Sequence, residues 1–166
     1  MHIALLEDEI TLAQEVTALL TAAGHTVEPC ADGHQIMRAL GRDTFDLFVL
    51  DWHVPGPNGL EVLLHLREVL KFSTPVVFLT SNSAEEQIVQ ALNSGADDYC
   101  SKPVRTHEFM ARLAALQRAE FERAALDPRQ LGHQQHIGLR GHAQARTRYR
   151  GRLTDAGHGA HIAALA

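Results

Sequence analysis

Short apolar runs alternate with amphipathic helical segments along the first 123 residues, and this alternation restricts the fold more than any other feature of the sequence. Five strand-like runs each precede a segment with helical periodicity. The runs cover 2–6, 26–30, 46–51, 75–79 and 98–101, and the helical segments cover 10–23, 35–40, 59–71, 84–94 and 106–123. Such alternation is typical of a parallel sheet with helices on both faces. The sequence therefore predicts a doubly wound α/β fold with five parallel strands.

The third strand ends at Asp51, after four consecutive apolar residues that indicate a buried parallel strand. A stretch rich in turn formers follows, and a helix begins near Leu60. In an open α/β sheet, groups at the carboxyl ends of strands face the ligand crevice. A carboxylate in that position can bind a metal or attack phosphorus. An aspartate that merely opens a loop is the alternative, and this strand end alone favours that alternative.

The other strand ends change this balance. Glu7, Asp8 and Glu9 follow the first strand, and adjacent carboxylates repel each other unless a cation or water shields them. Hard oxygen ligands of this kind suit Mg²⁺. A solvated acidic turn that caps the next helix is the alternative, and both interpretations can hold at once. The fourth strand ends at Thr80 and the fifth at Lys102. Acids, a hydroxyl and an ammonium are the groups that an aspartyl phosphate requires.

These strand ends lie in stretches that resemble the receiver domain of two-component response regulators. The matching stretches are LLEDE, DLFVLDWHVPGPNGLEVL, VVFLTSNSAEE and SGADDYCSKPV, in the order and spacing of that family. The resemblance covers residues 1 to about 123 and is closest to receivers of the winged-helix transcription-factor class. It implies a flavodoxin-like (βα)5 fold with strand order 2-1-3-4-5.

The resemblance also implies roles for the acidic residues. Asp51 would accept phosphate from a cognate sensor histidine kinase. Asp8 would bind Mg²⁺ directly and Glu7 through water, with Asp51 and the main-chain carbonyl of His53 as further ligands. His53 departs from the residues common at its position, and it lies close enough to the phosphorylation site to alter the lifetime of the phosphate.

For the remaining strand ends, the resemblance implies that Thr80 closes onto the phosphoryl group and that Lys102 pairs with it. Tyr99 would be an aromatic switch that rotates on activation. The peptide bond between Lys102 and Pro103 would be cis, which only a few per cent of X-Pro bonds are. Ser81 replaces the small apolar residue that usually follows the threonine, a difference that affects none of these roles.

Receivers of this class dimerise through charged pairs on one face, here formed by residues 84–94, 98–101 and 106–123. This chain carries only part of that charge pattern, so a homodimer through this face is expected to be weakened. The matching residues are Asp97, Asp98 and Arg112, and the departures are Ile88 and Asn93.

Residues 124–166 differ in composition from the rest. Residues 1–123 carry a formal charge of −9, whereas this segment carries +4 and is rich in His, Arg, Gly and Ala. It contains no winged-helix pattern, so DNA binding is not expected. Its five histidines offer a weak metal-binding hypothesis, and its arginines could contact nucleic acid or form a solvated basic tail. We expect a disordered tail, or the remnant of a truncated or frameshifted effector.

Composition limits the location of the protein and the state of its thiols. The chain has no long apolar run and no signal-peptide layout, so a cytoplasmic protein with no membrane contact is expected. Cys30 and Cys100 fall on opposite edge strands of the predicted sheet and are expected to be thiols.

The favoured function is a phosphorelay switch rather than a turnover enzyme. Its output would be regulated transcription or, in a stand-alone receiver, docking to another protein. A phosphohydrolase that uses an aspartyl phosphate is the alternative from another class. Such hydrolases have a second aspartate two residues after the nucleophile, but here His53 occupies that position.

Overall fold

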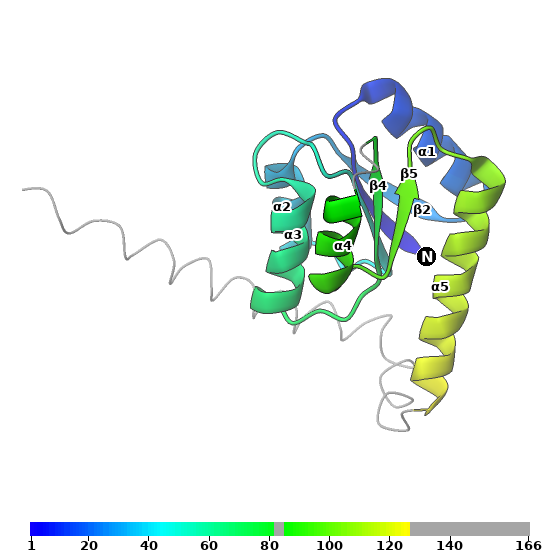
Figure 1. Cartoon of the computed structure of the whole chain (residues 1–166). Coiled ribbons are helices and arrows are strands. Elements are labelled where there is room, and N and C mark those ends of the chain that lie inside the picture. The colour runs from blue at the N-terminus through cyan, green and yellow to red at the C-terminus, as the bar shows by residue number, and fades with distance from the viewer. Residues whose placement is uncertain (82–84, 127–166) are drawn as a thin grey trace, which may run out of the picture.

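The computed structural model describes residues 1–81 and 85–126 and contains one five-stranded sheet. All neighbouring strands are parallel, and their order is β2-β1-β3-β4-β5 (Figure 1). This confirms the predicted fold class and strand order. The predicted tail lies largely outside the described residues. The strands are β1 (His2–Leu6), β2 (Thr26–Cys30), β3 (Leu47–Leu50), β4 (Val76–Thr80) and β5 (Asp98–Ser101).

Helices cover both faces of the sheet and enclose two apolar cores (Figure 1). Helices α1 and α5 pack on one face, and α2, α3, η1 and α4 pack on the other. Alternate side chains of the central strands enter the two cores, which explains why β3 and β4 are apolar and fully buried. The helices are α1 (Ile10–Ala22), α2 (Gly33–Leu40), α3 (Gly59–Leu64), η1 (His65–Val69), α4 (Glu85–Asn93) and α5 (Thr106–Leu126).

The helix predicted over 59–71 is wrong in its second half. An Asn58–Glu61 capping box begins α3, but the α-helical pattern stops at Leu64 and a π-helical turn, η1, follows. There the amide of Leu70 donates to the carbonyl of His65, five residues back. Apolar periodicity could not reveal this turn, because a single wider turn hardly changes the spacing of apolar residues along the chain.

The other boundaries agree with the sequence to within a few residues. Helix α5 continues to Leu126, so no break in secondary structure marks position 123. Cys30 and Cys100 are buried free thiols on the two edge strands, as predicted. No helix in the described part of the chain is both long and apolar enough to cross a membrane.

Two glycines bring the loop after β3 into close contact with its neighbours. A β-carbon on Gly59 would overlap the main-chain oxygen of Asp51, and one on Gly33 would overlap that of Pro57. The amide of Gly59 also donates to Trp52, and the amide of Gly33 donates to Pro55. These approaches fix the loop that carries Asp51.

Gly59→Ala should therefore destabilise the protein by about 3 kcal/mol, because the added methyl group would displace the β3 carboxyl end. Gly24→Ala is the matched control: Gly24 has a φ of 83° and open space around it, so only the backbone penalty of about 1–2 kcal/mol applies. Urea unfolding measures both changes. An equal loss in the two variants would show that the Gly59 contact is unimportant.

Candidate functional site

Main-chain hydrogen bonds fix the predicted site residues where the strands end. The amide of Asp51 donates to Leu6 at 2.9 Å, which places the residue after β3 directly beside the end of β1. The amide of Lys102 donates to Thr80 at 2.9 Å and joins the ends of β4 and β5 in the same way. Parallel strands therefore bring residues that are far apart in sequence to one edge of the sheet.

The ammonium of Lys102 lies between two buried carboxylates. Its Nζ is 2.8 Å from Asp51 Oδ2 and 2.7 Å from Glu7 Oε2. Asp51 is only 5 % exposed and Glu7 only 2 %, so water screens their mutual repulsion weakly. Among the described residues, Lys102 is the cation that is paired with both carboxylates and offsets their repulsion.

The pKa values of the site follow from this burial. Burial raises the pKa of Glu7 above its usual value, although Lys102 opposes the effect. For Lys102, burial alone would lower the pKa, but its bonds to Asp51 and Glu7 raise it overall. The lysine therefore stays charged at neutral pH.

Three carboxylates at this edge can provide oxygens for one cation. Glu7, Asp8 and Asp51 each offer an oxygen within 4.8 Å of the other two. Asp8 is exposed, whereas the other two are buried, so a hydrated ion could approach from the Asp8 side. Glu7 Oε2 is buried and accepts no hydrogen bond from the described residues beyond its ion pair with Lys102. This spare acceptor and the hard oxygen donors fit a receiver-type metal site.

Thr80 and Tyr99 lie on the same face of neighbouring strands. Phe78 pairs with Tyr99, and Thr80 with Ser101, so side-chain alternation places Phe78, Thr80 and Tyr99 on one face. Thr80 is fully buried. Tyr99 is half-buried and packs against the core that includes Ala91 of α4, and burial raises its pKa.

The remaining predicted residues are also at this edge. The peptide bond between Lys102 and Pro103 is cis, as predicted. His53 is exposed, and its amide lies 3.3 Å from Asp51 Oδ1, in a hydrogen bond that orients the carboxylate. Ser83 lies three residues before Glu86, the spacing of a helix cap, but it is outside the described residues.

An apolar groove beside the acidic edge was missed by the sequence analysis. It has a volume of about 530 Å³ and lies between α1 and the edge strand β2. Ile10, at the start of α1, is 72 % exposed at this groove. The sequence signal for this groove is a set of small residues on α1, which leave space beside the helix. The apolar periodicity of α1 indicates only its buried side. These small residues are Ala13, Thr17, Ala18 and Thr21.

Comparison with known proteins decides the family. The model of the response regulator receiver domain matches residues 3–114. The chain belongs to this family. Receiver domains of response regulators are signalling proteins that act in phosphorelays and interact with histidine kinases, and this receiver contains the fold and acidic pocket of the family.

Relatives of this receiver include transcription regulators. Response regulator protein PmrA of Pseudomonas aeruginosa is 42 % identical over 124 residues, which cover 75 % of this chain and 56 % of the relative. Transcriptional regulatory protein TcrA of Mycobacterium tuberculosis is 39 % identical over 118 residues, covering 71 % and 46 %. The chain thus spans about half the length of these curated relatives.

Solved receivers have the same fold. The receiver domain of Francisella response regulator 1452 matches with a TM-score of 0.68 and 26 % identity, covering 72 % of this chain and 98 % of that one.

Lys102→Met should lower the free energy of unfolding by about 3–5 kcal/mol at pH 7 without added metal, because two buried carboxylates lose their counter-ion. Loss of the ammonium raises the pKa of Glu7 further in the folded state. The folded variant then binds a proton more tightly than the unfolded chain, so its deficit should shrink as pH falls from 7 to 5.

Lys71→Met is the matched control, since Lys71 is the other lysine and is exposed. Urea unfolding in EDTA at the two pH values measures the effect. A deficit in Lys102→Met that is absent at pH 7, or that grows on acidification, would contradict this electrostatic account.

Proposed function

We propose that Asp51 is the phosphoacceptor of a Mg²⁺-dependent phosphorelay and that its phosphorylation controls the face formed by α4, β5 and α5. The observation that carries the proposal is the Lys102 ammonium, 2.8 Å from Asp51 and 2.7 Å from Glu7, at an edge where Asp8 adds a third carboxylate. This arrangement places a nucleophilic oxygen and a fixed cation at one point. It offers no second carboxylate two residues after Asp51, as a phosphohydrolase would need.

In the proposed reaction, a carboxylate oxygen of Asp51 attacks phosphorus and forms an acyl phosphate. The P–N bond to the donor imidazole breaks, and its electron pair stays on the histidine. Lys102 keeps its proton and neutralises charge on the phosphoryl oxygens. Asp8 and Asp51 would hold Mg²⁺ directly, with the His53 carbonyl as a further ligand and Glu7 acting through water. The metal supplies charge neutralisation at the same oxygens.

We further propose that the Thr80 hydroxyl donates a hydrogen bond to the phosphoryl group. Tyr99 would then turn into the space that Thr80 leaves. Their shared face of the sheet supports this coupling. Phosphorylation would shift the population between two existing conformations rather than create a new one. The output surface is that of α4, β5 and α5, which would control transcription or the docking of another protein.

A homodimer through this face would require ion pairs to exchange. Within the chain, Arg112 lies 3.1 Å from Asp98 and 2.8 Å from Glu108, and Asp97 is bound by Arg67. Charges that are already paired gain less from a second copy. A weak homodimer therefore remains our prediction for this face.

The apolar groove between α1 and β2 is the surface we propose for the kinase. A donor histidine must reach Asp51, so the kinase has to bind next to the acidic edge. The groove shares Glu7 and Asp8 with that edge, and Ile10 projects from its rim. Burial of one such side chain contributes about 1.5–3 kcal/mol.

Asp51→Asn should abolish labelling by acetyl phosphate in Mg²⁺, because an amide is not nucleophilic enough to form the acyl phosphate. Intact-mass spectrometry measures the incorporated phosphoryl group. Asp46→Asn is the matched control, since Asp46 is exposed at the opposite end of the same strand. Equal labelling of Asp51→Asn and wild type would rule out Asp51 as the acceptor.

Ile10→Asp should slow phosphotransfer from a kinase that phosphorylates the wild type by about tenfold, because the interface loses one buried side chain. Labelling by acetyl phosphate should be unchanged, since that donor needs no docking surface. Phe121→Asp is the control, with a similarly exposed side chain on α5. Similar kinase rates for Ile10→Asp and Phe121→Asp would place the kinase elsewhere.

A further inference from the structure

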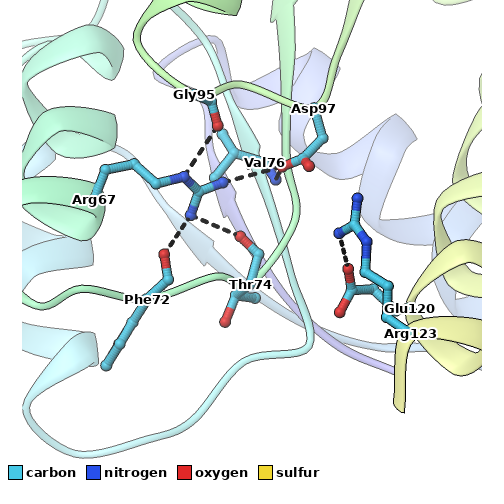
Figure 2. Close-up of polar contacts among 8 residues, drawn as sticks. All are labelled: Arg67, Phe72, Thr74, Val76, Gly95, Asp97, Glu120 and Arg123. Carbon is cyan, nitrogen blue, oxygen red and sulfur yellow. Dashed lines mark hydrogen bonds and ion pairs between the residues drawn. The ribbon is translucent and has the colours of Figure 1, made fainter. Parts of the chain in front are cut away.

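A single arginine joins three segments at the end of the sheet opposite to the phosphorylation site. Arg67, in η1, donates from Nε to Gly95 at 3.0 Å and from Nη2 to the Asp97 carboxylate at 3.0 Å (Figure 2). Its Nη1 donates to the carbonyls of Phe72 at 2.8 Å and Thr74 at 2.9 Å. Four of the five guanidinium N–H groups are therefore used. The set of Arg67, Phe72, Thr74, Val76, Gly95 and Asp97 is called the Arg67 cluster below.

Asp97 extends the cluster into the sheet. Its Oδ2 accepts a hydrogen bond from the amide of Val76 at 2.9 Å as well as from Arg67 (Figure 2). Its own amide donates to the carbonyl of Val76 at 2.8 Å. Val76 begins β4 and Asp97 immediately precedes β5, so these bonds hold the starts of both strands together. Arg67 and Asp97 side chains are only about one-fifth exposed, which limits solvent screening of the pair.

The C-terminal end of α4 is attached to the same cluster. The amide of Gly95 donates to Leu92, and that of Ala96 donates to Ala91, so a Schellman turn ends α4 directly before the cluster. Gly95 has a φ of 97°, and a β-carbon there would lie 3.2 Å from Arg67 Nε. Glycine thus allows both the left-handed backbone and the close approach of the arginine. Through this turn, Arg67 holds both the C-terminal end of α4 and the start of β5.

The opposite ends of β4 and β5 carry the proposed switch. Thr80 is four residues beyond Val76, which corresponds to about 13 Å of extended strand. At that end the amide of Lys102 donates to Thr80, and Tyr99 packs beneath α4. The unit formed by β4, α4 and β5 therefore has two different ends. Its base is bound by the half-buried guanidinium of Arg67, and its phosphoryl end bears Thr80 and Tyr99.

We propose that Arg67 is a positioning residue for the switch: it keeps the base of the β4–α4–β5 unit fixed, so that activation moves the unit only at its phosphoryl end. This inference rests on the proposed function of Asp51. It follows from the number of bonds involved, because moving the base relative to Arg67 would break four hydrogen bonds, three to main-chain carbonyls and one to the Asp97 carboxylate. Displacement at Thr80 is then converted into a tilt of α4 about its C-terminal end.

Amide NMR spectra with and without Mg²⁺ and beryllofluoride test the proposal on the whole chain. In the wild type, the signals of Thr80 and Tyr99 should shift, whereas those of Val76, Gly95 and Asp97 should stay in place. In Arg67→Gln, beryllofluoride should still bind, but the shifts should spread to the Arg67 cluster. The Asp97 amide should also exchange about tenfold faster, the factor expected for losing one hydrogen bond to a charged group.

Arg42→Gln is the matched control, since Arg42 also forms an ion pair, with Glu28, at the far edge of the sheet. It should behave as the wild type does. Arg67→Lys is a milder variant in case Arg67→Gln does not fold, because one ammonium retains the charge but cannot reach four acceptors.

The outcomes separate the two proposals. Wild-type shifts at Val76, Gly95 and Asp97 as large as those at Thr80 would overturn the role of Arg67, whatever the variants do. Shifts that stay confined to the phosphoryl end in Arg67→Gln or Arg67→Lys would also overturn it. If beryllofluoride leaves Thr80 and Tyr99 unmoved in the wild type, the proposed switch fails and this inference fails with it.

Discussion

The contact of the Lys102 ammonium with two buried carboxylates is the interaction on which the rest of the site depends. Glu7 and Asp51 come from different strands and would repel each other at this depth without a cation. The parallel sheet brings them together, and Lys102 stabilises them there. The Asp51 carboxylate is therefore buried beside a positive charge, the environment that the proposed phosphoryl transfer requires.

The sheet also separates the acidic edge from the Arg67 cluster, which lie at opposite ends of β4 and β5. Charged groups lie at both ends of β4 and β5, but the two ends differ in how much of their hydrogen-bonding capacity is used. At the phosphoryl end, Glu7 Oε2 keeps spare acceptor capacity, which suits a site that must bind a metal and a phosphoryl group. At the other end, Arg67 has few donors left unused. In the proposed switch, the phosphoryl end would change its partners on activation, whereas the end held by Arg67 would keep its partners.

The sequence predicted the alternating strands and helices and the polar residues at the strand ends, because these depend on local patterns, whereas the strand order followed from the family resemblance. Apolar runs indicated the strands, and polar residues directly after them had to meet at one edge. The cis bond before Pro103 and the positions of Thr80 and Tyr99 followed from the family resemblance. Even so, the roles of these residues stay predictions. The π-helical turn and the Arg67 cluster could not be predicted, because the bonds of Arg67 reach residues up to 30 positions away and no local pattern marks them. The groove beside Ile10 likewise depends on how α1 lies over an edge strand.

The most direct test of the account is a crystal structure of the protein with Mg²⁺ and beryllofluoride. We predict beryllium bound to a carboxylate oxygen of Asp51, with fluorides in contact with Lys102 and Thr80. The metal should bind Asp8, Asp51 and the His53 carbonyl. Beryllofluoride bound away from Asp51, or a metal with neither Asp8 nor Asp51 among its ligands, would contradict the assignment of this strand edge as the phosphorylation site.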